Sequence, residues 1–244
     1  MKKTFLILVS IMLFSVATGK AQHINDNQLF DIQKIDSVTF FTLKEKANIQ
    51  KVELEEITDF EQAKKMLEGR VIWGKFDEET GEFFEDEQAL ANKFGNGVYK
   101  IMFRNGKTYL VDYPNVSFFI AYFPQEDVLL LEGGHTSDVS FNLTTGEERE
   151  DVGVPWYYVY SPSKKYRLNG YDDGQECAYY FIQEKIDGQY QRIISLYYAF
   201  QNIVDFRFCW ILDAFWENDT TLNIITTEYP DERYEKLYYR IILK

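Results

Sequence analysis

The chain has 244 residues and a formal net charge of −13, from 39 acidic and 26 basic side chains. So acidic a surface repels phosphate backbones and anionic lipid head groups, and no compact Lys/Arg patch in the sequence outweighs that repulsion. Binding to nucleic acid or to a membrane surface is therefore not expected. The length suits one large domain or two smaller ones.

Residues 1–21 have the features of a secretory signal peptide. Lys2 and Lys3 precede an apolar stretch at residues 5–14, and Gly19-Lys20-Ala21 offers small residues at the −3 and −1 positions of a cleavage site. The stretch is shorter than the about 20 residues of a membrane-spanning helix, and no cysteine follows it for lipid attachment. We expect a soluble, exported protein, periplasmic or extracellular, without membrane insertion. Cleavage removes three lysines and no acids, which changes the formal charge from −13 to −16.

Residues 22–97 are predicted to form a small α+β region. Asp59 is a suitable N-cap for a short helix, and Gly69 supplies its stop signal. Strands are expected at residues 38–43, 49–57 and 71–73, and a second short helix at residues 87–94.

Residues 98–244 are predicted to form a β domain. All eighteen tyrosines lie at Tyr99 or later, among β-branched residues and frequent turn residues, a composition typical of antiparallel sheets. Residues 98–104 and 107–113 flank Asn105-Gly106, which predicts a two-residue type I′ hairpin.

Beyond Pro114 the strand pattern repeats loosely every roughly 40 to 50 residues, which predicts three consecutive four-stranded antiparallel meanders. The first three strands of each are expected at 116–123, 128–131 and 138–143; at 156–160, 166–168 and 177–186; and at 204–212, 215–216 and 222–227. Each fourth strand is expected after Thr145-Gly146, Asp187-Gly188 or Pro230-Asp231.

Ser161-Pro162-Ser163-Lys164-Lys165-Tyr166 resembles the Ser-Pro-Asp-Gly-Lys turn of blades in periplasmic Tol-type and WD-repeat β-propellers. The resemblance covers residues 116–244 at most and implies propeller-like blades. The turn lacks the glycine of that motif, no Trp-Asp pair ends a third strand, and closed propellers have about four to eight blades. The expected fold is mainly β, a propeller-like series of meanders that either stays open or is completed by the N-terminal part.

The run from Trp156 to Tyr160 has large, mostly apolar side chains on both faces of the expected strand, which indicates burial between two sheets. If Trp156 is in the core, Trp156→Ala is expected to cost about 3–5 kcal/mol.

The residues that could carry catalysis or hold a metal form no recognised pattern, and no catalytic residue, metal or cofactor is assigned. His135, Ser137 and Asp138 share one loop, whereas triad partners are assembled by the fold and rarely lie so close in sequence. Neither His23 nor His135, the only histidines, stands at ligand spacing from a cysteine. The acidic run at residues 172–176 lacks the register of a calcium loop.

Cys177 and Cys209 are the only cysteines. An exported protein permits a disulfide between them, but both lie in apolar, strand-like sequence where cysteine also packs as a small hydrophobic residue. Both interpretations stay open.

Exposed aromatic residues are the candidate ligand-binding residues, because tyrosine and tryptophan join a large flat body to a polar group. Most aromatic residues are expected in the core. Tyr171, next to Asp172 and Asp173, and Trp216, next to Glu217, are expected to be exposed and to contact a ligand.

The leading interpretation is an exported, non-catalytic β-rich binding protein whose partner is an extracytoplasmic protein, peptide or glycan. The alternative is an exported hydrolase that uses carboxylates and acts on glycans. Two acids facing each other in a deep pocket would favour the enzyme, and a shallow tyrosine-lined surface would favour binding.

Overall fold

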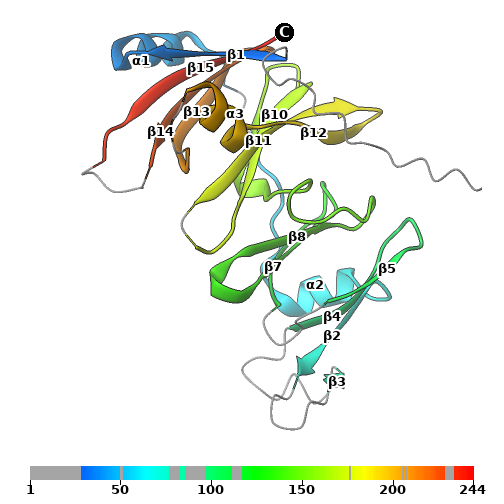
Figure 1. The fold of residues 1–244 in the computed structure, drawn as a ribbon. Helices are drawn as coiled ribbons and strands as arrows, with labels where there is room; N and C mark the ends of the chain where they lie inside the picture. The colour runs from blue at the N-terminus through cyan, green and yellow to red at the C-terminus, as the bar shows by residue number, and fades with distance from the viewer. Residues whose placement is uncertain are drawn as a thin grey trace, which may run out of the picture.

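The computed structural model describes residues 29–49, 52–76, 83–85, 97–111, 117–175, 177–204, 206, 208–228 and 234–244. Over these ranges the chain is mainly β, in three antiparallel sheets that follow one another in a row (Figure 1). The described strands form no closed barrel or propeller. The expected signal peptide and the expected helix at residues 87–94 lie outside the described residues.

The first sheet has the strand order β3-β2-β4-β6-β7-β8, with β5 paired to β4. Its strands are β2 (Val71–Phe76), β3 (Phe83–Glu85), β4 (Gly97–Met102), β5 (Thr108–Leu110), β6 (Phe118–Phe123), β7 (Val128–Glu132) and β8 (Asp138–Asn142). Helix α2 (Phe60–Met66) begins after Asp59 as predicted, because the Asp59 carboxylate accepts the Gln62 N–H at 2.8 Å. The strand expected after Thr145-Gly146 is reduced to one isolated bridge between Phe141 and Glu148.

The hairpin around Asn105-Gly106 is confirmed, but its predicted turn type is wrong. Only Gly106 of this pair has a positive φ, +85°. Its N–H donates to the Phe103 carbonyl at 3.1 Å, and the Phe103 N–H donates to the Lys107 carbonyl at 2.9 Å. The connection is therefore a type I turn followed by a left-handed glycine, the three-residue alternative to a type I′ hairpin.

The middle sheet has the order β12-β11-β10-β9 and matches the predicted second meander. Its strands are β9 (Val159–Tyr160), β10 (Tyr166–Asp172), β11 (Ala178–Ile186) and β12 (Gln189–Ser195). The first strand is shorter than predicted, because Pro155 begins a 3₁₀ turn, η4 (Pro155–Tyr157), and proline has no N–H for a strand ladder. Trp156 in this turn is 52% exposed, so its predicted burial is wrong.

The last sheet has the order β1-β15-β14-β13. Its strands are β1 (Phe30–Ile35), β13 (Trp210–Asn218), β14 (Thr221–Thr227) and β15 (Leu237–Leu243). The two strands predicted at 204–212 and 215–216 are wrong: one strand, β13, continues through Asp213 with a register shift there instead of a turn. Helix α3 (Leu196–Ile203), between β12 and β13, was not predicted.

The N-terminal residues depart most from the sequence prediction. The strand predicted at residues 38–43 is helix α1 (Ser37–Lys46), which begins where the Asp36 carboxylate accepts the Thr39 N–H at 2.7 Å. Of the strand predicted at 49–57, the described part forms only an isolated bridge from Ile57 to Tyr122. Strand β1 pairs with β15 and β2 with β4, so strand pairs join residues on both sides of position 97.

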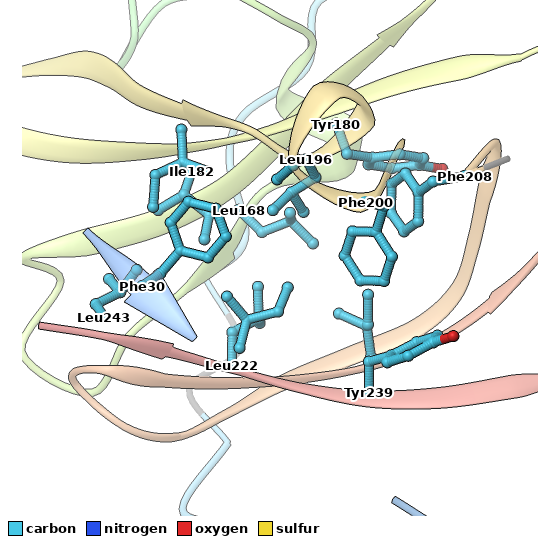
Figure 2. Close-up of a cluster of buried hydrophobic side chains, with 14 of the residues drawn as sticks. Phe30, Leu168, Tyr180, Ile182, Leu196, Phe200, Phe208, Leu222, Tyr239 and Leu243 are labelled. Carbon is cyan, nitrogen blue, oxygen red and sulfur yellow. The ribbon is translucent and has the colours of Figure 1, made fainter. Parts of the chain in front are cut away.

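The three sheets pack on one another through aromatic and aliphatic side chains, which confirms that the tyrosine-rich half folds as successive packed antiparallel sheets. Figure 2 shows the cluster between the middle and last sheets, where the Phe200 ring lies 4.5 Å from that of Phe208 and 4.9 Å from that of Tyr239. A second cluster joins Phe123 and Leu130 of the first sheet to Phe181 of the middle sheet.

A disulfide joins Cys177, in the loop before β11, to Cys209, just before β13, with the Cα atoms 4.6 Å apart. It links the middle sheet to the segment that enters the last one.

Among the helices that the structure describes, none combines the length and apolar character needed to cross a bilayer.

Candidate ligand-binding groove

A concavity of about 290 Å³ lies at the end of the middle sheet that carries the β10–β11 turn. We call it the tyrosine groove. Its lining includes Arg149, Tyr171, Asp173, Tyr179, Arg192 and Tyr198. These side chains come from the loop after β8, from three strands of the middle sheet or their connections, and from the first turn of α3.

The strand register brings the tyrosines of the groove together. Tyr171 of β10 lies opposite Tyr179 of β11, and their rings stack with centroids 5.4 Å apart. The series continues from Tyr179 to Tyr197 at 5.2 Å and from Tyr197 to Tyr198 at 5.4 Å. It leads from the largely covered Tyr171 to Tyr198, which is 59% exposed. Four rings thus form one continuous series with its exposed end at α3, and Tyr171, Tyr179 and Tyr198 of this series line the groove.

The turn at Asp172–Gly174 holds this end of the hairpin in place. The Asp172 carboxylate accepts the Gly174 N–H at 2.9 Å. Gly174 has a φ of +75°, and a Cβ atom there would lie 2.2 Å from the His135 carbonyl oxygen. Glycine is therefore required at this position, both for the left-handed backbone and for the close approach to the neighbouring loop.

Charged groups of both signs surround the rings. Arg192 lies 3.8 Å from the Glu150 carboxylate and 3.2 Å from that of Asp151. Arg149 donates through Nε to the Asp138 carbonyl at 3.1 Å and through Nη2 to the Ser137 hydroxyl at 3.3 Å. The groove therefore offers donors, acceptors and flat apolar surface together, which is the composition of a recognition site.

The hydroxyls of Tyr171 and Tyr179 stay protonated at neutral pH. Burial, with smaller contributions from Glu150 and Tyr179, raises the pKa of Tyr171 to about 12, although Arg149 and Arg192 oppose the shift. Burial, together with the Asp173 carboxylate, also raises the pKa of Tyr179. Both residues can therefore donate and accept hydrogen bonds near pH 7.

The structure separates the four residues predicted to bind a ligand. Tyr171 and Asp173 line the groove. Asp172 caps the turn, and its N–H donates to the Asp138 carboxylate at 2.8 Å. Trp216 lies between the middle and last sheets, where its Nε1 donates to the Val159 carbonyl at 2.8 Å.

The predicted exposure of Tyr171 and Trp216 is wrong, since they are 8% and 2% exposed. The polar neighbour Glu217 does not indicate the exposure of Trp216, because successive side chains of a strand point to opposite faces. Tyr171 contributes one largely covered wall of the groove rather than a free ring.

Sequence reasoning did not assign Tyr179, Arg149 or Arg192 to the site. The register of the β10–β11 hairpin, counted outward from its turn, would have placed Tyr179 opposite Tyr171. Arg149 reaches the groove from the loop after β8, and no local sequence pattern predicts that contact.

The described residues contain no group of three or more His, Cys, Asp or Glu side chains arranged to hold a metal ion. Comparisons with protein-family models, with curated proteins and with solved structures found no match to this chain. Inference about function therefore rests on the chemistry of the groove.

Proposed function

We propose that the protein is an exported, non-catalytic binding module whose tyrosine groove takes a segment of an extracytoplasmic protein, peptide or glycan. The observation that carries this proposal is the continuous series of four tyrosine rings, 5.2 to 5.4 Å apart, that ends at the exposed Tyr198. Tyrosine gives a large contact area at a low cost in side-chain entropy, and it is enriched at binding surfaces for this reason.

The covered end of the groove supports the same proposal. Tyr171 and Tyr179 are held by strand pairing and by stacking on each other, so the site is largely formed before a ligand arrives. Such preorganisation lowers the cost of association. Arg149, Arg192 and Asp173 add hydrogen-bonding groups that select the orientation of a bound segment.

Export, and a propeller-like relation between the three sheets, belong to the same proposal. The signal-like sequence at residues 1–21 and the disulfide between Cys177 and Cys209 support an oxidising compartment outside the cytoplasm. The consecutive packing of the three antiparallel sheets, of which the middle and last have four strands each, is compatible with blades that stack without closing.

A binding screen with the mature chain, residues 22–244, tests the proposed function. We expect a hit on an immobilised glycan array or a random peptide library, and Tyr198→Ala should weaken that hit by about tenfold or more, the loss of one aromatic anchor. Because Tyr198 is exposed, this variant should fold as the wild type does. Tyr234→Ala, at an exposed tyrosine in another part of the chain, is the matched control and should bind as the wild type does. If Tyr198→Ala binds the ligand as strongly as Tyr234→Ala does, the ligand binds outside the tyrosine groove and the proposal is wrong.

One observation favours the alternative, a carboxylate-dependent hydrolase that acts on glycans. Burial, with the nearby Asp172 carboxylate, raises the pKa of Asp138, against the opposing effects of the Asp172 N–H and Arg149. A carboxyl group with a raised pKa is the usual general acid of glycoside hydrolysis. If this alternative holds, the mature chain should release reducing ends from the glycans that the array identifies. The Asp138→Asn variant should not release them.

A further inference from the structure

We propose that a second cavity, between the first and middle sheets, binds a single uncharged sugar ring, independently of the tyrosine groove. We call it the Arg167 cavity. It measures about 290 Å³, the space of roughly ten water molecules at about 30 Å³ each, which is room for one small ring. Its walls include Glu126, Glu147, Arg167, Lys185, Gln189 and Tyr190.

The Arg167 side chain is almost completely enclosed, with 4% of the residue exposed. Its guanidinium lies between two tyrosine rings, 3.7 Å from the centroid of Tyr158 and 3.9 Å from that of Tyr190. Cation–π contacts on both faces fix the plane of the group. A ligand can therefore approach only along its edge.

Two of the three guanidinium nitrogens are already used. Nε donates to the Gln183 side chain at 2.6 Å, and Nη1 donates to the Glu126 carboxylate at 2.7 Å. Nη2 donates to none of the residues that the structure describes, and it is not among their fully buried unpaired atoms, so it is open to the cavity. A donor at the open edge of a fixed guanidinium can be satisfied either by water or by an oxygen atom of a ligand.

The charges around the cavity favour an uncharged ligand. The carboxylates of Glu126, Asp127 and Asp151 are paired with Arg167, Arg104 and Arg192. Lys185 and Glu147 are left at the rim as one cation and one anion, and Gln189 adds an uncharged amide. These groups offer donors and acceptors in balance. Adjacent hydroxyl groups, each both donor and acceptor, match such a set, whereas a carboxylate ligand would face Glu126 and Glu147.

A residue-resolved NMR titration of the ¹⁵N-labelled mature chain tests the proposal. The probes are the methyl glycosides of glucose, galactose, mannose and N-acetylglucosamine, each added to about 50 mM, because a few hydrogen bonds give a Kd near 1 mM, or about −4 kcal/mol. We expect at least one glycoside to shift the signals of Gln183, Lys185, Gln189 and the Arg167 Nε–H. The signals of Tyr179 and Tyr198 should stay in place.

Two variants and one control accompany the titration. Gln189→Ala changes an exposed residue at the start of β12 and should weaken glycoside binding about fivefold or more. Arg167→Lys keeps the positive charge, removes the planar edge and should abolish binding. Tyr198→Ala should leave binding unchanged, so failure of the groove and failure of the cavity are distinguishable.

Three results would overturn the proposal. The first is the absence of shifts with all four glycosides, and the second is shifts confined to the tyrosine groove. The third is tighter binding of glucuronate than of methyl glucoside, which would make the cavity a carboxylate site.

Discussion

Asp127 connects the hairpin of β4 and β5 to the turn between β6 and β7. Its carboxylate accepts two hydrogen bonds from Arg104, at 2.6 and 2.9 Å, one from the Tyr122 hydroxyl at 2.9 Å and one from the Thr144 hydroxyl at 2.6 Å. Burial opposes ionisation, but the hydrogen bonds from Arg104, Thr144 and Tyr122 outweigh it and hold the pKa of Asp127 below its usual range.

This lowered pKa predicts a pH-dependent contribution to stability. The folded chain binds the Asp127 proton more weakly than the unfolded chain, so the contribution is complete above the ordinary aspartate pKa and declines as the pH falls through the folded value. We expect Asp127→Asn to lower the free energy of unfolding by about 2–3 kcal/mol at pH 7, and by less below about pH 4. Urea titrations at several pH values measure the difference. Asp187→Asn, at an exposed turn aspartate, is the control, and an equal cost of Asp127→Asn at pH 7 and pH 3 would contradict the assignment.

The two tryptophans next to the middle sheet have exchanged their predicted roles. Trp156 is exposed and donates to the Glu56 carboxylate at 3.2 Å, whereas Trp216 is buried against Tyr166, with ring centroids 6.2 Å apart. Trp216→Ala should therefore cost about 3–5 kcal/mol, and Trp156→Ala less than about 1.5 kcal/mol. Thermal melting of the two variants beside the wild type gives the comparison. A larger loss for Trp156→Ala would restore the original prediction.

At the scale of elements, α1 shows where local preference and tertiary packing disagree. Val38, Thr39 and Thr42 favour a strand by composition, but the Asp36 cap and the burial of Phe40 produce a helix instead. The Phe40 ring lies 5.1 Å from that of Phe215 and 5.6 Å from that of Tyr238, both in the last sheet. Packing against the last sheet makes this segment a helix rather than a strand, since intrinsic secondary-structure preferences are small.

Truncation of Phe40 tests whether this packing holds α1 in place. We expect Phe40→Ala to lower the free energy of unfolding by about 3–5 kcal/mol and to speed amide exchange in residues 37–46. Phe41→Ala, one position along the same helix and 48% exposed, should cost less than about 1.5 kcal/mol. Similar losses in the two variants would show that α1 does not depend on its buried face.

The elements that local patterns predicted well share a physical cause. The Asp59 cap, the Asn105-Gly106 hairpin and the strands of the middle sheet depend on residues close in sequence, where turn chemistry and alternation act directly. The predictions at residues 38–43 and 204–216 failed because distant contacts, with β13 and β15 in one case and within the last sheet in the other, selected the structure.

At the scale of the whole molecule, the row of sheets is held by packed clusters and by one covalent link. The Cys177–Cys209 disulfide closes a loop with a sequence separation of 32, so in the chain-entropy description it stabilises the folded state by about 3–4 kcal/mol. Reduction of the wild type, or the double variant Cys177→Ser/Cys209→Ser, should lower the free energy of unfolding by that amount. Denaturant titration with and without reductant measures it, and the double variant should not respond to reductant. An unchanged midpoint in fully reduced wild type would show that packing alone joins the two sheets.

The candidate site was only partly predictable. The sequence indicated Tyr171 and Asp173 through a tyrosine beside a polar turn, and both line the groove. The sequence did not indicate Arg149, which lies in the loop after β8, or the Arg167 cavity, whose walls come from two sheets. Sites of this kind depend on how sheets pack, and packing is not a local property of the chain.

Composition and local periodicity alone indicated that residues 98–244 are mainly antiparallel strands, where several of the turns fall, and that the chain is acidic and carries a signal-like start. Only the tertiary structure decided that β1 pairs with β15, from Phe30 opposite Leu243 to Ile35 opposite Tyr238, and which aromatic rings stay exposed. The physical reason is range: turns and strand alternation arise within a few residues, whereas burial and strand partners are set by contacts between segments that lie far apart in the sequence.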